Sequence, residues 1–499
     1  MKIKTLKIVV QSVAFISICL LFWYLRYPIN NFFNAILFFQ LSPIISIVSN
    51  FLSIAVIFAT LLIIITLIFG RVFCGWICPY GTLMDIVSFF IGIFKKNKEN
   101  QPKKIKFKYF FLILLVILTA FGLQLFWLFE PITIFARGFY FTFYSIANNL
   151  SNDFFYNLMS NGPGKITEGI YQITKSTIIE NRELYFNHSL SMLVIFIIPL
   201  LLLLFRRRFW CRYICPLGSF LATISTKSLL TRQSNECLTK CGQCKNLCRM
   251  NAIKDNNTYI KQECILCMDC VQETKCVNKY KSKFSFTKHI ICNLPNDNKP
   301  QQKSGISRKD FLSWLIVSLG LISLAVKNKF INKKTNIIRP PGILNEKDLK
   351  LKCIRCGNCI KACVTNGLQP VLLEAGLDGI WTPKLDAKIG YCEYECTLCG
   401  HVCPTQAIKK LTVEEKMKIK IGIAKIQKDT CISWKEGLEC LVCEEHCPIP
   451  SKAIKVKKEN INGDLVKVPY INEDLCIGCS ICQNKCPVDG KKGIIVESL

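Results

Sequence analysis

Cys476-Ile-Gly-Cys479-Ser-Ile-Cys482-Gln-Asn-Lys-Cys486-Pro487 places four cysteines at the spacing C-x2-C-x2-C-x3-C-P. In this run, three thiolates bind one iron–sulfur cluster, and the fourth, which precedes a proline, binds a neighbouring cluster. Structural zinc sites use paired C-x2-C halves and seldom end in C-P. The stretch therefore predicts [4Fe-4S] clusters.

Three related groups of cysteines precede this run and extend the pattern over residues 340–499. They predict an α+β domain of bacterial ferredoxin-like modules with four clusters. Neighbouring groups are expected to pair, with Cys363 serving the cluster of the second group and Cys403 that of the first; a nested pairing of first with fourth and second with third stays open. The sixteen predicted ligands are Cys353, Cys356, Cys359, Cys363, Cys392, Cys396, Cys399, Cys403, Cys431, Cys440, Cys443, Cys447, Cys476, Cys479, Cys482 and Cys486.

Residues 237–300 contain a further pair of cysteine groups, which predicts a two-cluster ferredoxin module. By the crossed rule, Cys276 completes the first set and Cys248 completes the second. With the C-terminal domain, this module gives six [4Fe-4S] clusters in all. Its predicted ligands are Cys237, Cys241, Cys244, Cys248, Cys264, Cys267, Cys270 and Cys276.

Residues 1–236 predict a polytopic α-helical membrane domain. Apolar segments at 8–25, 51–69, 107–129 and 190–205 are each near the roughly 20 residues that cross a bilayer. Positive charge precedes the first segment, fills the 95–108 loop and follows the fourth, whereas loops 26–50 and 130–189 are poorer in it. Under the positive-inside rule, this predicts four spans with the N-terminus and the first ferredoxin module in the cytoplasm.

Two thiol pairs form an internal repeat in this membrane domain. Cys74 and Cys78 follow the second span, Cys211 and Cys215 follow the fourth, and both pairs read C-x3-C-P-x-G-[Ser/Thr] after an aromatic residue. Cysteines four residues apart on a helical turn face the same way, so the pairs are expected to meet at a pseudo-twofold interface. A shared metal, a cluster and a redox-active thiol site stay open, as does plain packing of four small apolar side chains.

Residues 305–339 predict a signal-like membrane segment and linker. Ser307-Arg308-Lys309-Asp310-Phe311-Leu312 is similar to a twin-arginine export signal, with lysine in place of the second arginine. The apolar run that follows has the length of a signal core. We expect it to carry residues 340–499 to the periplasm, as a fifth crossing; an ordinary fifth helix without export is the alternative.

Composition limits the remaining function classes. The formal net charge is +30, but the basic residues flank apolar segments and no nucleic-acid-binding module is recognisable. Thirty cysteines in a chain of 499 residues are grouped as metal ligands are, and do not resemble a small disulfide scaffold. We therefore expect the membrane, and no nucleic acid, as a partner.

The motifs together carry a family resemblance. Residues 1–276, with four apolar segments, two C-x3-C-P pairs and a two-cluster pattern, resemble NapH. Residues 305–499, with a signal-like segment and four cysteine groups, resemble ferredoxins of the MauM/NapG type. The chain thus resembles a NapH–NapG fusion, and NosG/NosH and the membrane part of NosR share these motifs.

This resemblance implies a membrane-bound iron–sulfur protein of anaerobic respiration. Its activity would be that of a quinol (menaquinol) dehydrogenase, which passes electrons to a periplasmic nitrate or nitrous oxide reductase or to its cytochrome or ferredoxin mediator. Quinone would be a further cofactor. Glu130, beside Pro131 at the end of the third predicted span, is a candidate acceptor of a quinol proton, and a solvated loop charge is the alternative. Two alternatives remain: a maturation factor that handles copper or reduces a metal or thiol site, and a cytoplasmic ferredoxin hub that feeds the quinone pool.

Overall fold

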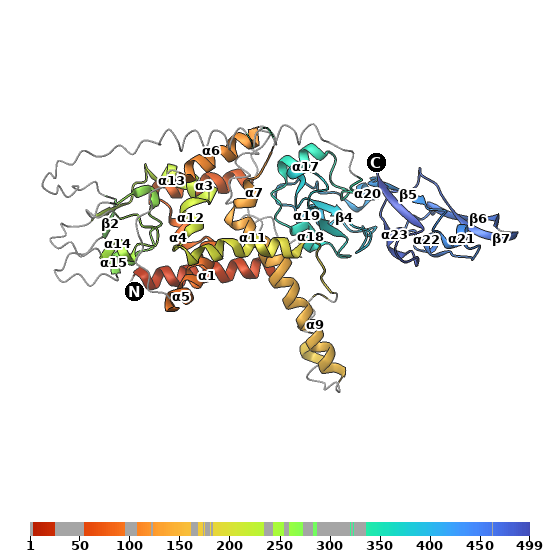
Figure 1. The fold of residues 1–499 in the computed structure, drawn as a ribbon, viewed down its shortest axis with the longest axis horizontal. Coiled ribbons are helices and arrows are strands. Elements are labelled where there is room, and N and C mark those ends of the chain that lie inside the picture. Colours follow the sequence, from red (N-terminus) through yellow and green to blue (C-terminus); the bar gives the residue numbers. More distant parts are fainter. Residues whose placement is uncertain are drawn as a thin grey trace. The chain divides into compact units, whose positions relative to one another are not determined.

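A computed structural model describes residues 3–24, 54–94, 107–120, 123–160, 168–172, 174, 180, 183–233, 243–253, 259–272, 283–286, 320, 323, 336–461 and 463–499. The chain divides into two compact units (Figure 1). Unit 1 comprises Met1–Phe22, Ala35–Gly138 and Ser191–Lys327, and unit 2 comprises Trp23–Asn34, Phe139–Leu190 and Asn328–Leu499. Residues 139–190, which the sequence placed in the membrane domain, therefore cluster with the C-terminal ferredoxin domain.

Unit 1 is mainly helical. Its longer helices are largely apolar. Short helices α4 and α12 contain the first cysteine of each C-x3-C-P motif, and α5 and α13 begin at the proline of that motif. Its elements are α1 (Ile3–Tyr24, ending in unit 2), α3 (Ile54–Phe69), α4 (Val72–Trp76), α5 (Pro79–Phe94), α6 (Phe107–Ala120), α7 (Phe126–Phe129), α8 (Pro131–Gly138), α11 (Ser189–Leu201), η4 (Leu202–Leu204), α12 (Phe209–Tyr213), α13 (Pro216–Ser225), β1 (Thr231–Gln233), α14 (Gln243–Leu247), η5 (Lys261–Glu263), α15 (Asp269–Gln272) and β2 (Lys283–Ser285).

Among the described residues, one segment, Thr5–Trp23 in α1, is long and apolar enough to cross a membrane. The other apolar helical segments are shorter: Ala59–Phe69, Phe107–Ala120, Ser189–Leu204 and Pro216–Ser225. The predicted span at 107–129 is not one helix. The Leu123 N–H donates to the Leu118 carbonyl at 2.9 Å, a bond across five residues that closes the end of α6, and α7 begins separately.

Several of these helices expose large apolar side chains. On α1, Val9, Val13 and Ile16 are about half exposed. Ile113 on α6 is exposed to the same extent, and Leu190 on α11 is exposed further. An apolar surface of this extent is unusual for a protein surrounded by water and marks a face that contacts lipid or another protein.

Unit 2 joins one long helix to a chain of small two-stranded sheets. All of its strand pairs are antiparallel, and the register of β5 with β8 pairs Ile426 with Ile494. Its elements are η3 (Phe139–Tyr144), α9 (Ser145–Ser160), α17 (Glu346–Lys352), α18 (Asn358–Ala362), β3 (Leu368–Pro370), η6 (Leu377–Gly379), β4 (Pro383–Leu385), α19 (Leu398–His401), α20 (Val413–Met417), β5 (Gly422–Ile426), α21 (Ile432–Lys435), α22 (Val442–Glu445), β6 (Ile454–Ile461), β7 (Asp464–Ile471), α23 (Ile481–Lys485) and β8 (Ile494–Ser498).

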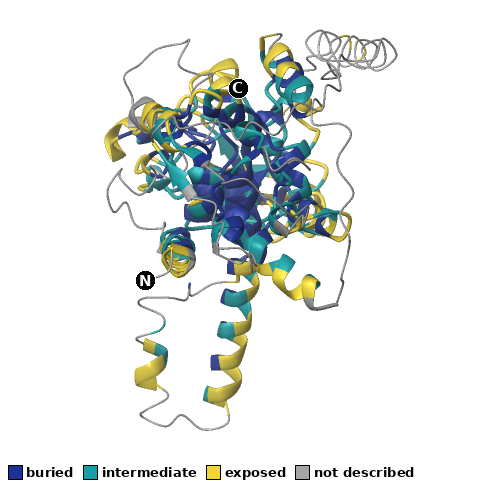
Figure 2. Ribbon diagram, turned by 90° about the vertical axis from the view of Figure 1, so that its left-hand side faces the viewer, coloured by how far each residue is buried: buried dark blue, intermediate teal, exposed yellow. Residues whose placement is uncertain are grey.

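Burial differs sharply between the parts of unit 2. Only two residues of helix α9 are buried and it is drawn largely in yellow in Figure 2, whereas four of the six residues of η3 before it are buried. Short helices and strands give the C-terminal domain little continuous core of its own. Buried aliphatic residues such as Ile360, Leu368 and Ile494 line the cysteine sites instead.

Candidate functional site

Three C-x2-C-x2-C loops share one backbone conformation. The residues immediately before and after the middle cysteine have positive φ in each loop, and they occupy the same two positions throughout. Four of the six are not glycine, so each pays the steric cost of the left-handed region. Alternating conformations of this kind turn successive N–H groups inward and are found at iron–sulfur sites. The residues are Leu266 and Met268, Arg355 and Gly357, and Gly478 and Ser480.

In the C-terminal domain, three cysteines of one group and one cysteine of a neighbouring group surround a shared cavity. Centre A is formed by Cys353, Cys356, Cys359 and Cys403, around a cavity of about 400 Å³. Centre B is formed by Cys363, Cys392, Cys396 and Cys399, around a cavity of about 400 Å³. Centre D is formed by Cys431, Cys440, Cys443 and Cys486, around one of about 370 Å³.

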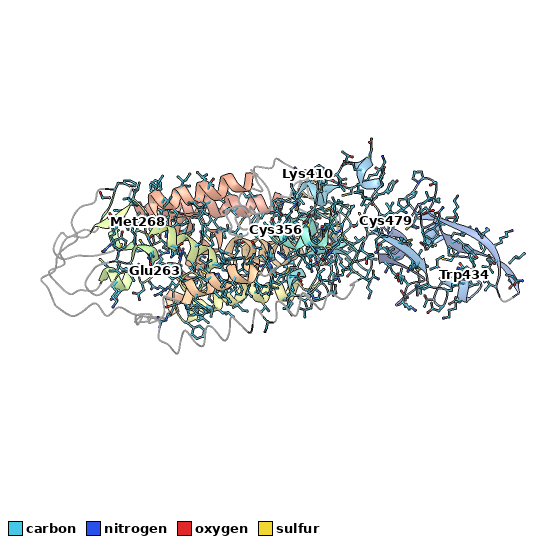
Figure 3. All side chains as sticks on the ribbon, turned by 90° about the horizontal axis from the view of Figure 1, so that it is seen from above. Glu263, Met268, Cys356, Lys410, Trp434 and Cys479 are labelled. Carbon is cyan, nitrogen blue, oxygen red and sulfur yellow. The ribbon has the colours of Figure 1, made fainter. Side chains whose placement is uncertain are left out.

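In the remaining centre of this domain, centre C, Cys476, Cys479 and Cys482 lie on the third loop. Cys447 is close enough to Cys479 to influence its pKa. Each neighbouring pair of groups thus exchanges its fourth cysteine, as the crossed rule expects, and the nested pairing is not the one adopted. Figure 3 labels Cys356 of centre A and Cys479 of centre C.

The four centres follow one another along the domain. Centres A and B share α18 and α19, and centres C and D share α22 and α23. The two pairs meet where the Cys392 N–H of centre B donates to the carbonyl of Cys479 in centre C, at 2.9 Å. The order is therefore A, B, C, D, with A nearest to η3 and D nearest to the β6–β7 hairpin.

The donor set fits iron–sulfur clusters. Burial raises the pKa of Cys392 to about 11 and those of Cys443 and Cys479 to about 12, and neighbouring thiols add to each rise. Four such thiols can all be deprotonated only if cationic metal replaces their protons. Among the described residues, no group of three or more His, Cys, Asp or Glu converges to hold a single metal ion. The tetrads of centres A, B and D instead surround cavities.

Backbone N–H groups and buried cations lie beside the cysteine sulfurs of these centres. N–H groups of Leu368, Ile408 and Ala424 donate to the sulfurs of Cys363, Cys403 and Cys476 at 3.4–3.5 Å. Buried Arg355 lies beside centre A, and buried Lys416 lies beside centre B, where its Nζ donates to the carbonyls of Glu393 and Tyr394. Hydrogen bonds to the sulfurs and buried positive charge both raise a cluster's reduction potential.

The first ferredoxin module, in unit 1, is described in part. Cys248, Cys264, Cys267 and Cys270 surround a cavity of about 390 Å³ and form centre M, in which Cys248 is the crossed ligand. The Ala252 N–H donates to the Cys248 sulfur at 3.2 Å. Cys244 lies on α14, and the other predicted ligands of the second cluster, Cys237, Cys241 and Cys276, lie outside the described residues.

The sequence suggested that each C-x3-C-P pair lies on a single helical turn. The structure shows that neither pair does. Cys74 lies in α4 and Cys78 follows its end, directly before Pro79 opens α5; Cys211 and Cys215 stand in the same way around the end of α12 and the start of α13. A proline begins a helix readily because the first N–H groups have no partner inside the helix. Each thiol pair therefore straddles a helix junction.

A network of buried charges attaches the first module to these junctions. Asp85 of α5 pairs with Arg208 at 2.7 Å, with Arg249 of the module at 2.8 Å, and with Lys7 at 3.8 Å. Burial alone would raise the pKa of Asp85, but Arg208 and the other cations hold that pKa well below its usual range.

The module also reaches the first thiol pair directly. Glu263, labelled in Figure 3, pairs with Lys108 and with Arg71. The Trp76 Nε1–H donates to the Leu266 carbonyl at 2.9 Å. A side chain at Gly75 would begin 2.1 Å from the Ile265 carbonyl oxygen, so only glycine allows this approach.

In unit 2, residues 139–190 hold centre A. Lys361 lies in α18, two residues after Cys359 of centre A. Its Nζ donates to the Trp23 carbonyl at 2.8 Å and lies 4.1 Å from the Tyr144 ring centroid. Asn366 and Gln369 donate to the Tyr185 carbonyl, the latter at 3.1 Å.

Sequence reasoning missed the residues that connect these sites. Arg71 and Arg208 could have been found from the repeat, because each lies three residues before the first cysteine of its C-x3-C-P pair. Asp85 and Glu263 carried no pattern, because their partners are distant in sequence. Glu130 is buried at the C-terminal end of α7, so it is not a solvated loop charge.

Comparison with known proteins agrees with this geometry. A family described as a 4Fe-4S binding domain matches residues 51–98 and 189–231, which contain both C-x3-C-P pairs. A second family with that description matches residues 469–490. No solved structure matches the chain.

Characterised relatives are ferredoxin-type proteins. The chain is 32% identical over 171 residues to the methylamine utilization ferredoxin-type protein MauM of Methylorubrum extorquens, which covers 34% of this chain and 76% of that protein. It is 31% identical over 157 residues to the ferredoxin-type protein NapG of Escherichia coli, covering 30% and 67%. This chain belongs to the MauM/NapG family of ferredoxin-type proteins. As a MauM/NapG-type protein with 4Fe-4S binding domains, it is an iron–sulfur electron-transfer protein.

Proposed function

We propose that this chain is a membrane-bound quinol dehydrogenase in which a NapH-like membrane part and a NapG-like ferredoxin domain are fused. Quinol would lose two electrons and two protons to become quinone, and the electrons would pass singly to a periplasmic reductase. Six [4Fe-4S] clusters, each a one-electron carrier, would conduct them. The observation that carries the proposal is the unbroken order of centres A, B, C and D, which is the arrangement of a conducting chain.

The membrane location is supported by apolar surface. The exposed faces of α1, α6 and α11 carry aliphatic side chains that lipid would cover. The helices described are shorter than full spans, apart from α1, so four crossings are part of the proposal. Lysines flank the ends of these helices in sequence and favour a cytoplasmic N-terminus.

The contacts of residues 139–190 favour a periplasmic C-terminal domain. This segment joins α8 to α11 at the ends opposite to the lysine-rich loop and to Arg206–Arg208. Because it binds centre A through Tyr185, Tyr144 and Asn187, it would hold the C-terminal domain on its own side of the membrane. The segment at 305–339 would then cross, as the export hypothesis expects.

Two experiments test this function. Purified full-length protein in detergent is mixed with a reduced menaquinone analogue, and cluster reduction is followed by loss of visible absorbance and by EPR. Reduction is expected in the wild type; a chain whose clusters respond to dithionite but never to quinol would refute the dehydrogenase. A reporter fused after Leu499 should be active only in the periplasm, and cytoplasmic activity would support the hub alternative instead.

The copper-handling alternative also has an observation in its favour. The Met84 sulfur lies 3.6 Å from the Cys211 sulfur, and thioether with thiolate is a donor set that selects Cu(I). Elemental analysis decides between the electron-transfer function and copper handling. A maturation factor would be isolated with copper, or would bind copper in preference to iron at these thiols.

A further inference from the structure

Four aromatic rings of unit 1 form a column that ends beside the second C-x3-C-P pair. This aromatic column consists of Phe107, Phe111, Phe129 and Trp210. Phe107 and Phe111 of α6 stack with their ring centroids 6.2 Å apart, and Phe111 meets Phe129 of α7 edge to face at 4.9 Å. Phe129 then stacks on Trp210 of α12 at 6.1 Å, with 23° between the ring planes. Three helices therefore contribute to one continuous set of rings.

The column exists because the third predicted span turns back on itself. After the end of α6, Leu123 packs against Leu114 and Leu118 of that helix. Along one straight helix, Phe111 and Phe129 would be about 27 Å apart, at 1.5 Å per residue. The turn brings their rings into contact instead. In a bilayer, a broken helix of this kind is tolerated only where it is buried in protein or lines a cavity.

Exposure falls along the column. Phe107 is exposed, Phe111 and Phe129 are half-buried, and Trp210 is only 5% exposed. The two rings that precede Trp210 thus keep part of their surface available to a ligand. Aromatic rings pack well against other flat rings, either offset and stacked or edge to face. The column therefore suits a flat, apolar ring that reaches inward as far as Trp210.

The innermost ring carries a polar group without a partner. The Trp210 Nε1–H is buried and has no hydrogen-bond acceptor among the residues that the structure describes. A buried donor of this kind costs free energy unless something accepts from it. The indole N–H groups of Trp76 and Trp434, by contrast, donate to backbone carbonyls. An oxygen acceptor on a ligand at the inner end of the column would satisfy Trp210 in the same way.

The internal repeat indicates that this donor is not needed for folding. Phe73 occupies the corresponding position of the first repeat, immediately before Cys74. The carbonyls of Phe73 and Trp210 each accept the N–H of the second cysteine of their own pair, both at 2.9 Å. Phenylalanine therefore supports the same backbone, and the indole N–H is an addition found only in the second repeat.

A buried carboxylate follows the column in the chain. Glu130 comes directly after Phe129 and is fully buried. Its carbonyl accepts the Ile134 N–H at 3.0 Å, so Glu130 stands at the start of α8. A structural role at this helix start is the simpler explanation of the carboxylate. Together with an aromatic surface and an unpartnered donor, however, it completes the set of groups that a quinol needs: a flat apolar wall, a donor to one oxygen and a base for its proton.

We propose that the head group of a quinol binds at the aromatic column, against Phe111 and Phe129. One quinol oxygen accepts a hydrogen bond from the Trp210 Nε1–H, and the Glu130 carboxylate takes the proton that a quinol hydroxyl loses. This site rests on the proposed quinol dehydrogenase function and gives it a location in the chain.

The reaction at this site balances. Both O–H bonds of the quinol break, two protons leave, one of them by way of Glu130, and quinone is formed. The two electrons leave singly, and each reduces one oxidised [4Fe-4S] cluster of the chain by one electron. Cys211 follows Trp210 directly and lies in a segment that the 4Fe-4S binding-domain family matches, so the site adjoins an electron acceptor.

Binding is measured on full-length, iron-loaded protein in detergent with 2-heptyl-4-hydroxyquinoline N-oxide, a fluorescent quinol analogue. Trp210→Phe should weaken binding about tenfold, because the hydrogen bond from the buried indole is lost, while iron content and visible spectrum stay as in the wild type. Trp434→Phe is the control, since it removes an indole N–H from the C-terminal domain, and its affinity should be unchanged. Equal affinities in all three proteins would overturn the site.

Glu130→Gln separates proton transfer from binding. This variant should bind the analogue as the wild type does, but a reduced menaquinone analogue should reduce its clusters about a hundredfold more slowly, with a flatter dependence on pH. A rate equal to that of the wild type would reject Glu130 as the proton acceptor.

A photoreactive azidoquinone tests the wild type itself, without relying on a variant that folds. After illumination, mass spectrometry should find the label on a peptide that contains residues 107–111, 126–130 or 209–213. Label confined to other peptides would overturn the site.

These results separate the site from the function on which it rests. If quinol reduces the clusters of the wild type and of Trp210→Phe equally well, with equal affinity, the site is rejected and the dehydrogenase stands. Binding that depends on Trp210 without any cluster reduction would support the site and reject the dehydrogenase.

Discussion

In the first ferredoxin module, Glu263 and Arg249 bind the helices of unit 1 through buried ion pairs. In the C-terminal domain, Lys361, Asn366 and Gln369 bind the neighbouring segments of unit 2 through hydrogen bonds to backbone carbonyls. A buried ion pair is costly to break, because removal of one partner leaves the other charge without compensation. Loss of one hydrogen bond costs far less. The two modules should therefore tolerate substitution very differently.

Asp85→Asn should have the largest effect. Arg208, Arg249 and Lys7 would lose their shared carboxylate, and the cost is expected to be about 3–5 kcal/mol. Thermal unfolding in detergent, followed by cluster absorbance, measures the change. Asp429→Asn is the control, since Asp429 pairs with Lys491 at the surface; equal losses in both variants would contradict the difference between the modules.

Gly75→Ala should have the next largest effect. The new Cβ would clash with the Ile265 carbonyl, and overpacking of this kind costs about 1–3 kcal/mol. Limited proteolysis should release the first module faster than in the wild type. Gly92→Ala is the control, because Gly92 lies in α5 and a Cβ there would have no atom within 4 Å. The rate at which proteolysis releases the first module should be unchanged or lower in this variant.

Lys361→Met should weaken the attachment of the C-terminal domain moderately. It removes one charged hydrogen bond and the cation–π contacts with Tyr140 and Tyr144 from a buried site, together worth about 2 kcal/mol. Lys428→Met is the matched variant, because Lys428 lies 3.9 Å from the Trp434 ring centroid but is exposed; it should cost about 0.5–1 kcal/mol. If the unfolding midpoints of Lys361→Met and Lys428→Met fell equally, burial would not be the cause of the expected difference between the two variants.

Lys425→Met should have the smallest effect. Its ion pair with Glu497 at 2.6 Å joins two well-exposed side chains, and water screens such pairs. We expect no measurable shift in the unfolding midpoint at 0.15 M salt. A clear loss here would show that surface charge contributes to the C-terminal domain, which would blur the contrast between the modules.

Cysteine spacing determined the tetrads of the C-terminal domain. Three consecutive ligands lie within one loop, so their geometry is local, and the crossed fourth ligand follows from the shortness of the chain between neighbouring groups. Membrane segments were predicted less well. The 107–129 segment is apolar throughout, but apolar composition does not show where a helix ends, and α6 ends at Ala120.

The sequence by itself thus predicted which cysteines come together in groups of four, because regular spacing of thiols is a local pattern. Tertiary structure alone decided that residues 139–190 belong with the C-terminal domain, and that Asp85 and Glu263 attach the first module through buried ion pairs. Among these contacts, Arg208 and Asp85 are 123 positions apart, and Asn187 and Asp386 are 199 positions apart. Only a folded chain brings such charges together, since no local pattern distinguishes a buried arginine with a distant partner from one that faces solvent.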